Sequence, residues 1–267
     1  MAEKTDLTDG LEAQWNIEHE ITFGKFRSFR LGLHLHERLA VTPVEKEVKV
    51  DIPYRQGAID MSRLTGGRIF YNRTITYVFY RFNVEQKNAK VLANHFQTTI
   101  ENLLMREFDQ ELHDSYDPEF HYKGKCSEVV VLDEYSHKRL RVEITFDLYP
   151  FKISNRAEST DLFDPLNFEL DVFQDELRFA VGTSWQTIQV YNAGHKIVAP
   201  SIIAQNSAGA TIATTGLEIS MNGRIYRPTG EPNFARIRLT PGVNVLQLRR
   251  TTGSVQWMRL DWQKEWI

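Results

Sequence analysis

The strongest constraint on the fold is a strict alternation of side chains over residues 140–149. Apolar residues take every second position and polar residues stand between them: Leu140, Val142, Ile144, Phe146 and Leu148. Because successive side chains of a β-strand point to opposite faces of a sheet, this pattern predicts a strand with one buried and one solvated face. That arrangement is typical of antiparallel sheets.

Two neighbouring segments complete the prediction for the first half of the chain. Residues 67–82 are rich in β-branched and aromatic side chains, which predicts one long strand, or two strands with a kink near Asn72. Apolar residues then recur every three or four positions over about residues 86–106, which predicts an amphipathic helix. A short strand at 129–132 and a loop at 133–138 precede the alternating strand. The first half is therefore predicted to be an α+β domain.

The second half lacks a comparable helical pattern. Short strands separated by glycine and proline are predicted at residues 187–192, 197–204, 211–213, 217–221, 236–239 and 243–249. This spacing predicts a β-sandwich or jelly roll. Asn222-Gly223 predicts a two-residue hairpin turn, because both residues tolerate positive φ. The fold class is thus mainly β with one helix.

A polar stretch separates the two halves. Residues 155–164 are mostly polar or charged, and Asp164-Pro165 is typical of a turn. We therefore expect an interdomain linker there, with one domain at 1–155 and a second at 156–267.

Composition narrows the class of protein. The formal net charge is −3 and 42% of residues are hydrophobic, which favours a globular chain over disorder or strong nucleic-acid binding. No apolar run approaches the length of a membrane helix, and the first ten residues lack the basic flank and apolar stretch of a signal peptide. We expect synthesis in a cytoplasm. The single Cys126 has no disulfide partner within the chain and is expected to pack as a small apolar residue.

Two groups of residues have ligand types suited to a metal. His34 and His36 would share one face of a strand, with His19 as a third zinc ligand. A second group has oxygen and nitrogen donors close in sequence: His113, Asp114, Asp117 and His121. Solvated histidines beside acidic neighbours explain the first group, and a turn capped by Asp117-Pro118 explains the second. We assign no metal site.

The sequence contains no coherent catalytic motif. It has no Gly-x-Ser-x-Gly elbow, no phosphate-binding glycine-rich loop ahead of a helix and no His-Glu-x-x-His. Three acidic residues are candidates for glycoside hydrolysis, but nothing singles them out: Asp171, Asp175 and Glu176. Arg249-Arg250 is too short for a nucleic-acid patch. Trp185 and Tyr191 are either sugar-stacking or core aromatics. No catalytic or cofactor-binding residue is assigned, and binding or assembly is favoured over catalysis.

Several motifs nevertheless occur together in a recognisable order. They are FGKFRS at 23–28, IPYRQGAID at 52–60, YNRTI at 71–75, DLYPFK at 147–152, VYNAGHKIVAP at 190–200 and LTPGVN at 239–244. This combination resembles the distal tail proteins (Dit) of long-tailed siphophages. The chain departs from that pattern at Tyr54, where the family usually has glycine, and by roughly 18 extra residues at its start.

The resemblance implies a non-enzymatic virion protein without cofactors. It implies a hexameric ring at the distal tail end, formed by the first domain, which joins the tail tube to the tip protein or baseplate and leaves a channel for DNA. The second domain would be galectin-like, and it would contact either only its neighbours, receptor-binding proteins or host cell-wall sugar. The resemblance also implies that the tryptophan-rich end, residues 255–267, returns to the first domain through Trp262 or Trp266. The alternatives are a carbohydrate-binding module or adhesin, and a glycosidase.

Overall fold

A computed structural model of the chain describes residues 20–62, 68–82, 89–106, 108–134, 138–157, 177–228 and 237–267. The chain divides into two compact units, residues 1–153 together with Ile267, and residues 154–266. The predicted linker, 155–164, begins inside strand β10 (Lys152–Ala157), and its remainder lies outside the described residues. The first three residues of the predicted linker continue a strand, and the linker itself stays a prediction.

The first unit is built on an antiparallel sheet. Along the sheet the strands follow in the order β2 (Phe26–Arg27), β1 (Ile21–Phe23), β7 (Gln110–Asp114), β8 (Phe120–Glu134), β9 (Arg139–Leu148), β6 (Arg73–Arg81) and β3 (His34–Ala40). A 3-10 turn, η1 (Phe29–Leu31), joins β2 to β3. In β9 burial alternates residue by residue, which confirms the predicted half-buried strand. The long strand predicted at 67–82 begins only at Arg73, next to the expected kink at Asn72.

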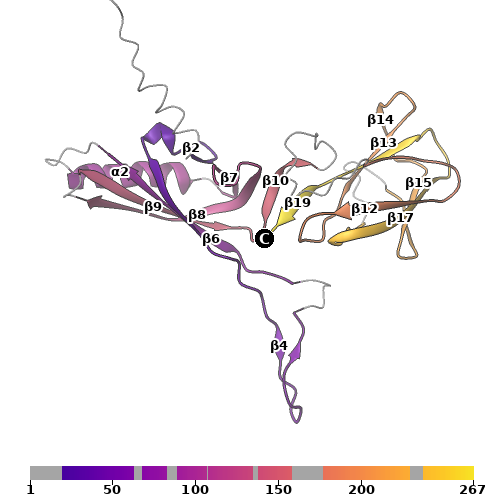
Figure 1. Ribbon diagram of the computed structural model, residues 1–267, viewed down its shortest axis with the longest axis horizontal. Helices are drawn as coiled ribbons and strands as arrows, with labels where there is room; N and C mark the ends of the chain where they lie inside the picture. The colour runs from indigo at the N-terminus through magenta and orange to yellow at the C-terminus, as the bar shows by residue number, and fades with distance from the viewer. Residues whose placement is uncertain are drawn as a thin grey trace, which may run out of the picture. The chain divides into compact units, whose positions relative to one another are not determined.

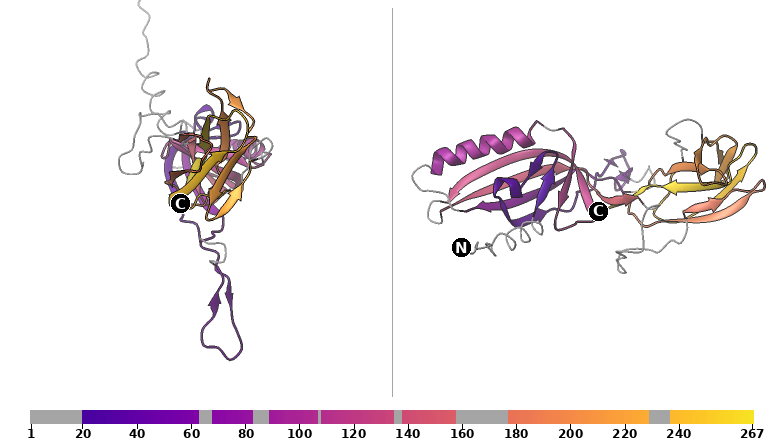
Figure 2. Two further views of the ribbon diagram at one scale, coloured as in Figure 1. Left: turned by 90° about the vertical axis from the view of Figure 1, so that its right-hand side faces the viewer. Right: turned by 90° about the horizontal axis from the view of Figure 1, so that it is seen from above.

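One α-helix lies within the described residues, α2 (Ala89–Leu104), inside the predicted range. Phe96, Ile100 and Leu104 recur four residues apart, so they share the face that packs on the sheet. Figure 2 shows the helix lying along one face of the strands. The core between the layers includes Tyr77 and Phe146, whose rings meet edge to face at 6.0 Å.

A long two-stranded ribbon, which we call the arm, connects β3 to β6. It covers residues 41–62 and 68–72, and its short strands are β4 (Lys49–Val50) and β5 (Ile59–Asp60). Backbone hydrogen bonds extend the pairing of the two halves of the ribbon beyond these strands. Tyr71 N donates to Val44 O at 2.8 Å, and Met61 N donates to Val48 O at 2.8 Å. Figure 1 shows the arm leaving the sheet of the first unit. The sequence-based prediction contained no such ribbon.

The second unit is a β-sandwich, as predicted. One sheet has the order β11 (Arg178–Ala180), β18 (Trp257–Asp261), β13 (Ser201–Gln205) and β14 (Thr211–Ile212). The other has the order β12 (Gln186–Asn192), β17 (Gly242–Arg250), β15 (Leu217–Met221) and β16 (Arg224–Tyr226). Both sheets contribute to one apolar core, for example Ile202 and Met258 from the first and Ile219 and Leu246 from the second.

Local signals in this unit were mostly accurate. Met221 pairs with Arg224, and Asn222 and Gly223 between them have φ of 52° and 75°, which confirms the predicted hairpin. Strands β18 and β19 (Gln263–Trp266), which pairs with β10, were not predicted.

The tryptophans near the end of the chain have partners within the second unit. Trp262 is buried in its core, and the ring of Trp266 lies 5.0 Å from that of His195. The Arg178 guanidinium lies over Trp257 at 4.5 Å. Return of the chain end to the first domain stays a prediction.

Gly216→Ala is expected to lower the free energy of unfolding of the second unit by about 2–4 kcal/mol, because a left-handed alanine is strained and its methyl group has no room. Gly216 has a φ of 81°, and an added Cβ would overlap the carbonyl group of Thr252. The control is Gly223→Ala, at a φ of 75° but with no atom within 4 Å of the added carbon. Urea unfolding followed by tryptophan fluorescence should show the larger loss for Gly216→Ala. Equal losses would show that backbone strain alone matters.

Candidate functional site

The histidines considered as zinc ligands lie on an edge strand against aromatic rings. His34 on β3 contacts Phe82 with 5.4 Å between ring centroids, and His36 contacts Tyr80 at 4.9 Å. A register shift between Leu35 and Glu37 interrupts the strand between them. His19 lies outside the described residues, as do Asp171, Asp175 and Glu176. The described part of the chain contains no group of three or more side chains placed to hold a metal ion.

The second predicted ligand group is divided between two different settings. His113 and His121 place their rings 5.3 Å apart on the outer side of β7 and β8. Asp114 belongs to the other face of β7, is buried like His121, and accepts hydrogen bonds from the backbone N–H groups of Tyr116 and Asp117, at 3.1 and 3.0 Å. The predicted turn at Asp117-Pro118 is present, but the carboxylate that caps it belongs to Asp114 and not to Asp117.

Asp114 and Asp117 form the centre of a buried polar network in the first unit. The Tyr77 hydroxyl donates to Asp114, and Arg38 Nε lies 3.1 Å from the same carboxylate. Arg38 also reaches Asp117 through Nη2 at 3.0 Å, and Lys152 Nζ lies 3.3 Å from Asp117. Arg38, Tyr77 and Asp114 come from β3, β6 and β7, so the network holds three strands together.

Burial and charge shift the pKa values of this network in opposite directions. The Tyr122 hydroxyl donates to Asp117 at 3.1 Å, and burial raises the pKa of Tyr122 to about 12. Burial alone would raise the pKa of Asp117, but Lys152 and Arg38 outweigh it and hold that pKa below its usual range. Burial lowers the pKa of Arg73, although the guanidinium stays charged. These groups are fixed and largely enclosed, which suits a structural network better than proton transfer to a substrate.

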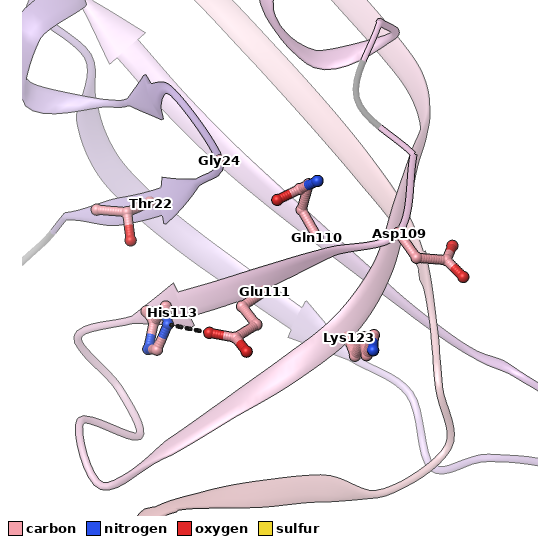
Figure 3. A pocket seen from close by; sticks show the side chains of 7 residues that line it. All are labelled: Thr22, Gly24, Asp109, Gln110, Glu111, His113 and Lys123. Atoms are coloured by element: carbon pink, nitrogen blue, oxygen red, sulfur yellow. Dashed lines mark ion pairs between the residues drawn. The ribbon is translucent and has the colours of Figure 1, made fainter.

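A pocket of about 300 Å³ opens on the outer side of β1, β7 and β8. Its lining residues, drawn in Figure 3, are Thr22, Gly24, Asp109, Gln110, Glu111, His113 and Lys123. The Glu111 carboxylate lies 3.5 Å from His113 Nε2. None of these lining residues belongs to a group of three side chains placed to hold a metal ion.

The most unusual surface of the first unit is one face of the arm. Val50 is paired with Ile59 and Lys49 with Asp60, so Val48 stands opposite Met61 on the same face as Val50 and Ile59. We call this set, Val48, Val50, Ile59 and Met61, the arm stripe. Val48, Val50 and Met61 are between 39% and 53% exposed. The opposite face is charged, with Lys49 Nζ 2.6 Å from Glu47.

An amphipathic two-stranded ribbon lacks the means to bury its own apolar face. Isolated ribbons are marginally stable in water, and contiguous exposed apolar surface marks a site of association. At the far end Tyr54 has a φ of 67° and is fully exposed. Glycine adopts this left-handed backbone more easily than other residues, so tyrosine at this position is strained.

The two aromatic candidates for sugar stacking lie in the second unit. Trp185 immediately precedes β12, and Tyr191 lies on β12 an even number of positions further along, so both belong to the same face of the strand. Both are half-buried. The Arg249 guanidinium lies over the Trp185 ring at 4.4 Å, which gives Arg249 a role that sequence reasoning had not found.

Cys126 is expected to react with a thiol reagent at pH 8 about a hundredfold more slowly in the folded protein than in urea, because the thiolate is the reactive form. Burial raises the pKa of this thiol to about 11. Release of nitrothiobenzoate from Ellman's reagent measures both rates. Equally rapid modification of the folded protein would contradict the buried position.

Comparisons with known proteins bear on the fold. No protein-family model and no curated protein matches the chain. Among solved structures the chain has the fold of a hub protein of the adsorption apparatus of phages that infect Gram-positive bacteria. That protein is Dit (gp 19.1) of phage SPP1, with a TM-score of 0.62 and 12% sequence identity over 93% of this chain and 99% of SPP1 Dit. The fold resemblance to distal tail proteins, expected from the motifs, is confirmed.

Proposed function

We propose that this chain is a structural component of a phage tail. The observation that carries the proposal is the fold likeness to SPP1 Dit, which includes almost the full length of both chains. A likeness confined to one unit would fit many unrelated proteins, because sandwich domains serve many functions. The sequence motifs shared with distal tail proteins point in the same direction. We assign no catalytic activity and no cofactor.

The finer proposal is a hexameric ring at the distal end of the tail, built by the first unit. A closed ring requires that one surface of each copy meets a different surface of the next. The arm stripe is one such surface. The strand order of the first unit ends at β2 on one side and β3 on the other, so two different edges also offer unpaired backbone groups.

The partners follow from that position in the virion. The ring would join the tail tube protein to the tail tip protein or baseplate and leave a channel for DNA. The second unit, as a galectin-like sandwich, would face receptor-binding proteins or host cell-wall sugar. No helix in the described residues is long and apolar enough to cross a membrane. We place the protein in the tail of the virion after its synthesis in the host cytoplasm.

Native mass spectrometry and negative-stain electron microscopy of the purified full-length chain test the ring. Six copies of a 31.1 kDa chain weigh about 187 kDa, and the images should show rings with a central channel. Addition of tail tube protein should stabilise the ring if the free protein dissociates. A strict monomer at micromolar concentration, unchanged by the tail tube protein, would contradict the proposal.

A further inference from the structure

A row of four side chains crosses one face of the β12–β17–β15–β16 sheet. Glu218 on β15 is paired with Arg249 on β17, and Arg227 follows β16 on the other side of Glu218. Trp185 stands beside Arg249 at the opposite end. The order across the sheet is therefore Trp185, Arg249, Glu218 and Arg227, and we call these four residues the clamp row.

One buried carboxylate holds both arginines of the clamp row. Arg227 Nε and Nη2 lie 2.8 and 2.6 Å from Glu218 Oε1, and Arg249 Nε and Nη2 lie 2.8 and 2.7 Å from Oε2. The side chain of Glu218 is only 6% exposed. Hydrogen bonds from Arg249 and then Arg227 lower the pKa of its carboxyl, so it stays ionised. Each guanidinium is thereby fixed in orientation.

The four residues of the clamp row carry a net positive charge. Two guanidinium groups face a single carboxylate, and each meets it through the Nε and Nη2 edge, which leaves Nη1 for another acceptor. Arg227 is 68% exposed along its side chain. Planar guanidinium groups bind phosphate and carboxylate well, and fixing them in advance removes part of the entropy cost of binding. The row is therefore prepared for an anionic group.

The neighbouring row supplies neutral hydrogen-bonding groups. Gln247 pairs with Thr187 on one side and with Ser220 on the other, and all three share the face of the clamp row. Thr187 and Gln247 are exposed. Trp185 stands at the adjacent end of the clamp row, and Tyr191 lies further along β12 on the same face. Hydroxyl and amide groups beside an aromatic ring suit a sugar, whose rings combine polar edges with apolar C–H faces.

We propose that this face binds an acidic saccharide, a sugar chain with phosphate or carboxylate groups. The anionic group would bind Arg227 and Arg249, and the sugar ring would lie over Gln247 and against Trp185. A peptide is disfavoured because the clamp row lies on the face of the sheet, where the backbone groups of β15 and β17 are already paired with neighbouring strands. Recognition here must come from side chains. The inference rests on the proposed contact of the second unit with cell-wall sugar, and it does not depend on ring assembly.

Isothermal titration calorimetry with the full-length chain tests the site. The probes are a glucuronate-containing hexasaccharide, a glycosylated oligo(glycerol phosphate), a neutral hexasaccharide, inorganic phosphate and poly-glutamate. The first two separate carboxylate from phosphate as the anion, and binding of either supports the proposal. We expect the acidic sugars to bind at least about tenfold more tightly than the neutral sugar and phosphate, with an affinity that falls as salt rises.

Matched variants locate the binding. Arg227→Gln should weaken acidic-sugar binding by at least about tenfold, while Glu218 remains paired with Arg249 and the melting temperature changes little. Arg224→Gln removes the same charge three residues earlier, at the start of β16, but Arg224 belongs to the opposite face of the sheet and lies over Tyr226 at 5.8 Å. It should bind within about twofold of the natural protein, since it leaves the clamp row intact.

Four results would overturn the proposal. They are equal losses in Arg224→Gln and Arg227→Gln, phosphate binding as tightly as the sugars, no binding to any probe, and binding of poly-glutamate without binding of sugar. The last result would assign the face to an acidic protein partner. The mass of the assembled protein, measured on the same samples, reports the ring separately, so failure of one proposal is distinguishable from failure of the other.

Discussion

Val50→Asp in the arm stripe is expected to convert the proposed ring of about 187 kDa into 31.1 kDa monomers at micromolar concentration. Val50 is 42% exposed in the single chain and pairs with Ile59 at the centre of the stripe. If the next copy covers this face, aspartate places an unpaired carboxylate in an apolar contact. Such a change costs about 2–4 kcal/mol at each interface, or at least about thirtyfold in affinity. Native mass spectrometry measures the result.

A matched variant separates the two faces of the arm. Lys49→Gln alters the neighbouring residue on the charged face, where Lys49 pairs with Asp60 and reaches Glu47. It should leave assembly unchanged because surface ion pairs contribute little. Circular dichroism must show that Val50→Asp still folds. A folded Val50→Asp protein that remains hexameric would exclude the arm stripe as the interface, without excluding the ring itself.

Arg38→Met is expected to lower the free energy of unfolding of the first unit by about 3–5 kcal/mol, since removal of one partner leaves a buried charge uncompensated. Arg38 Nε lies 3.1 Å from Asp114, whose side chain is only 1% exposed. Asp117 is less affected because it keeps Lys152. Such a loss is a large share of the roughly 5–15 kcal/mol that stabilise an ordinary domain.

The two units allow this loss to be assigned. Helix α2 lies in the first unit, so ellipticity at 222 nm follows that unit during urea unfolding. Four of the five tryptophans lie in the second unit, so tryptophan fluorescence mainly follows the unfolding of that unit. Arg38→Met should lower the urea midpoint measured by ellipticity and leave the midpoint measured by tryptophan fluorescence nearly unchanged. Arg38→Lys keeps the charge but loses the forked geometry, so its free energy of unfolding should lie between those of the natural protein and Arg38→Met. A stability of Arg38→Met equal to that of the natural protein would contradict the network.

The loss in Arg38→Met should also depend on pH. Lys152 and Arg38 together overcome burial and lower the pKa of Asp117 in the folded state. A carboxyl group of this kind contributes its full stabilisation above its unfolded pKa, and loses it as pH falls through the lower folded pKa. The difference between the natural protein and Arg38→Met should therefore be largest near neutral pH and shrink below about pH 4. Urea midpoints measured across this range test the trend.

The sequence by itself determined the elements whose signals are local. Burial in β9 follows the alternation that begins at Leu140, and α2 follows the spacing of Phe96, Ile100 and Leu104. The Asn222-Gly223 turn needed only the identity of two residues. Periodicity and turn chemistry are properties of a short stretch of chain, and therefore the sequence contains them directly.

Only the tertiary structure decided which distant residues meet. The arm has weak strand patterns, and its apolar stripe appears only once Val50 is placed opposite Ile59. In the sequence Arg249 belongs to a short basic pair with no assigned function. Strand register places it between Trp185 and Glu218. The partners of Asp114 come from other strands of the sheet. Strand register depends on how a whole sheet buries one face, so these contacts are set by packing over the entire unit and not by neighbours in the sequence.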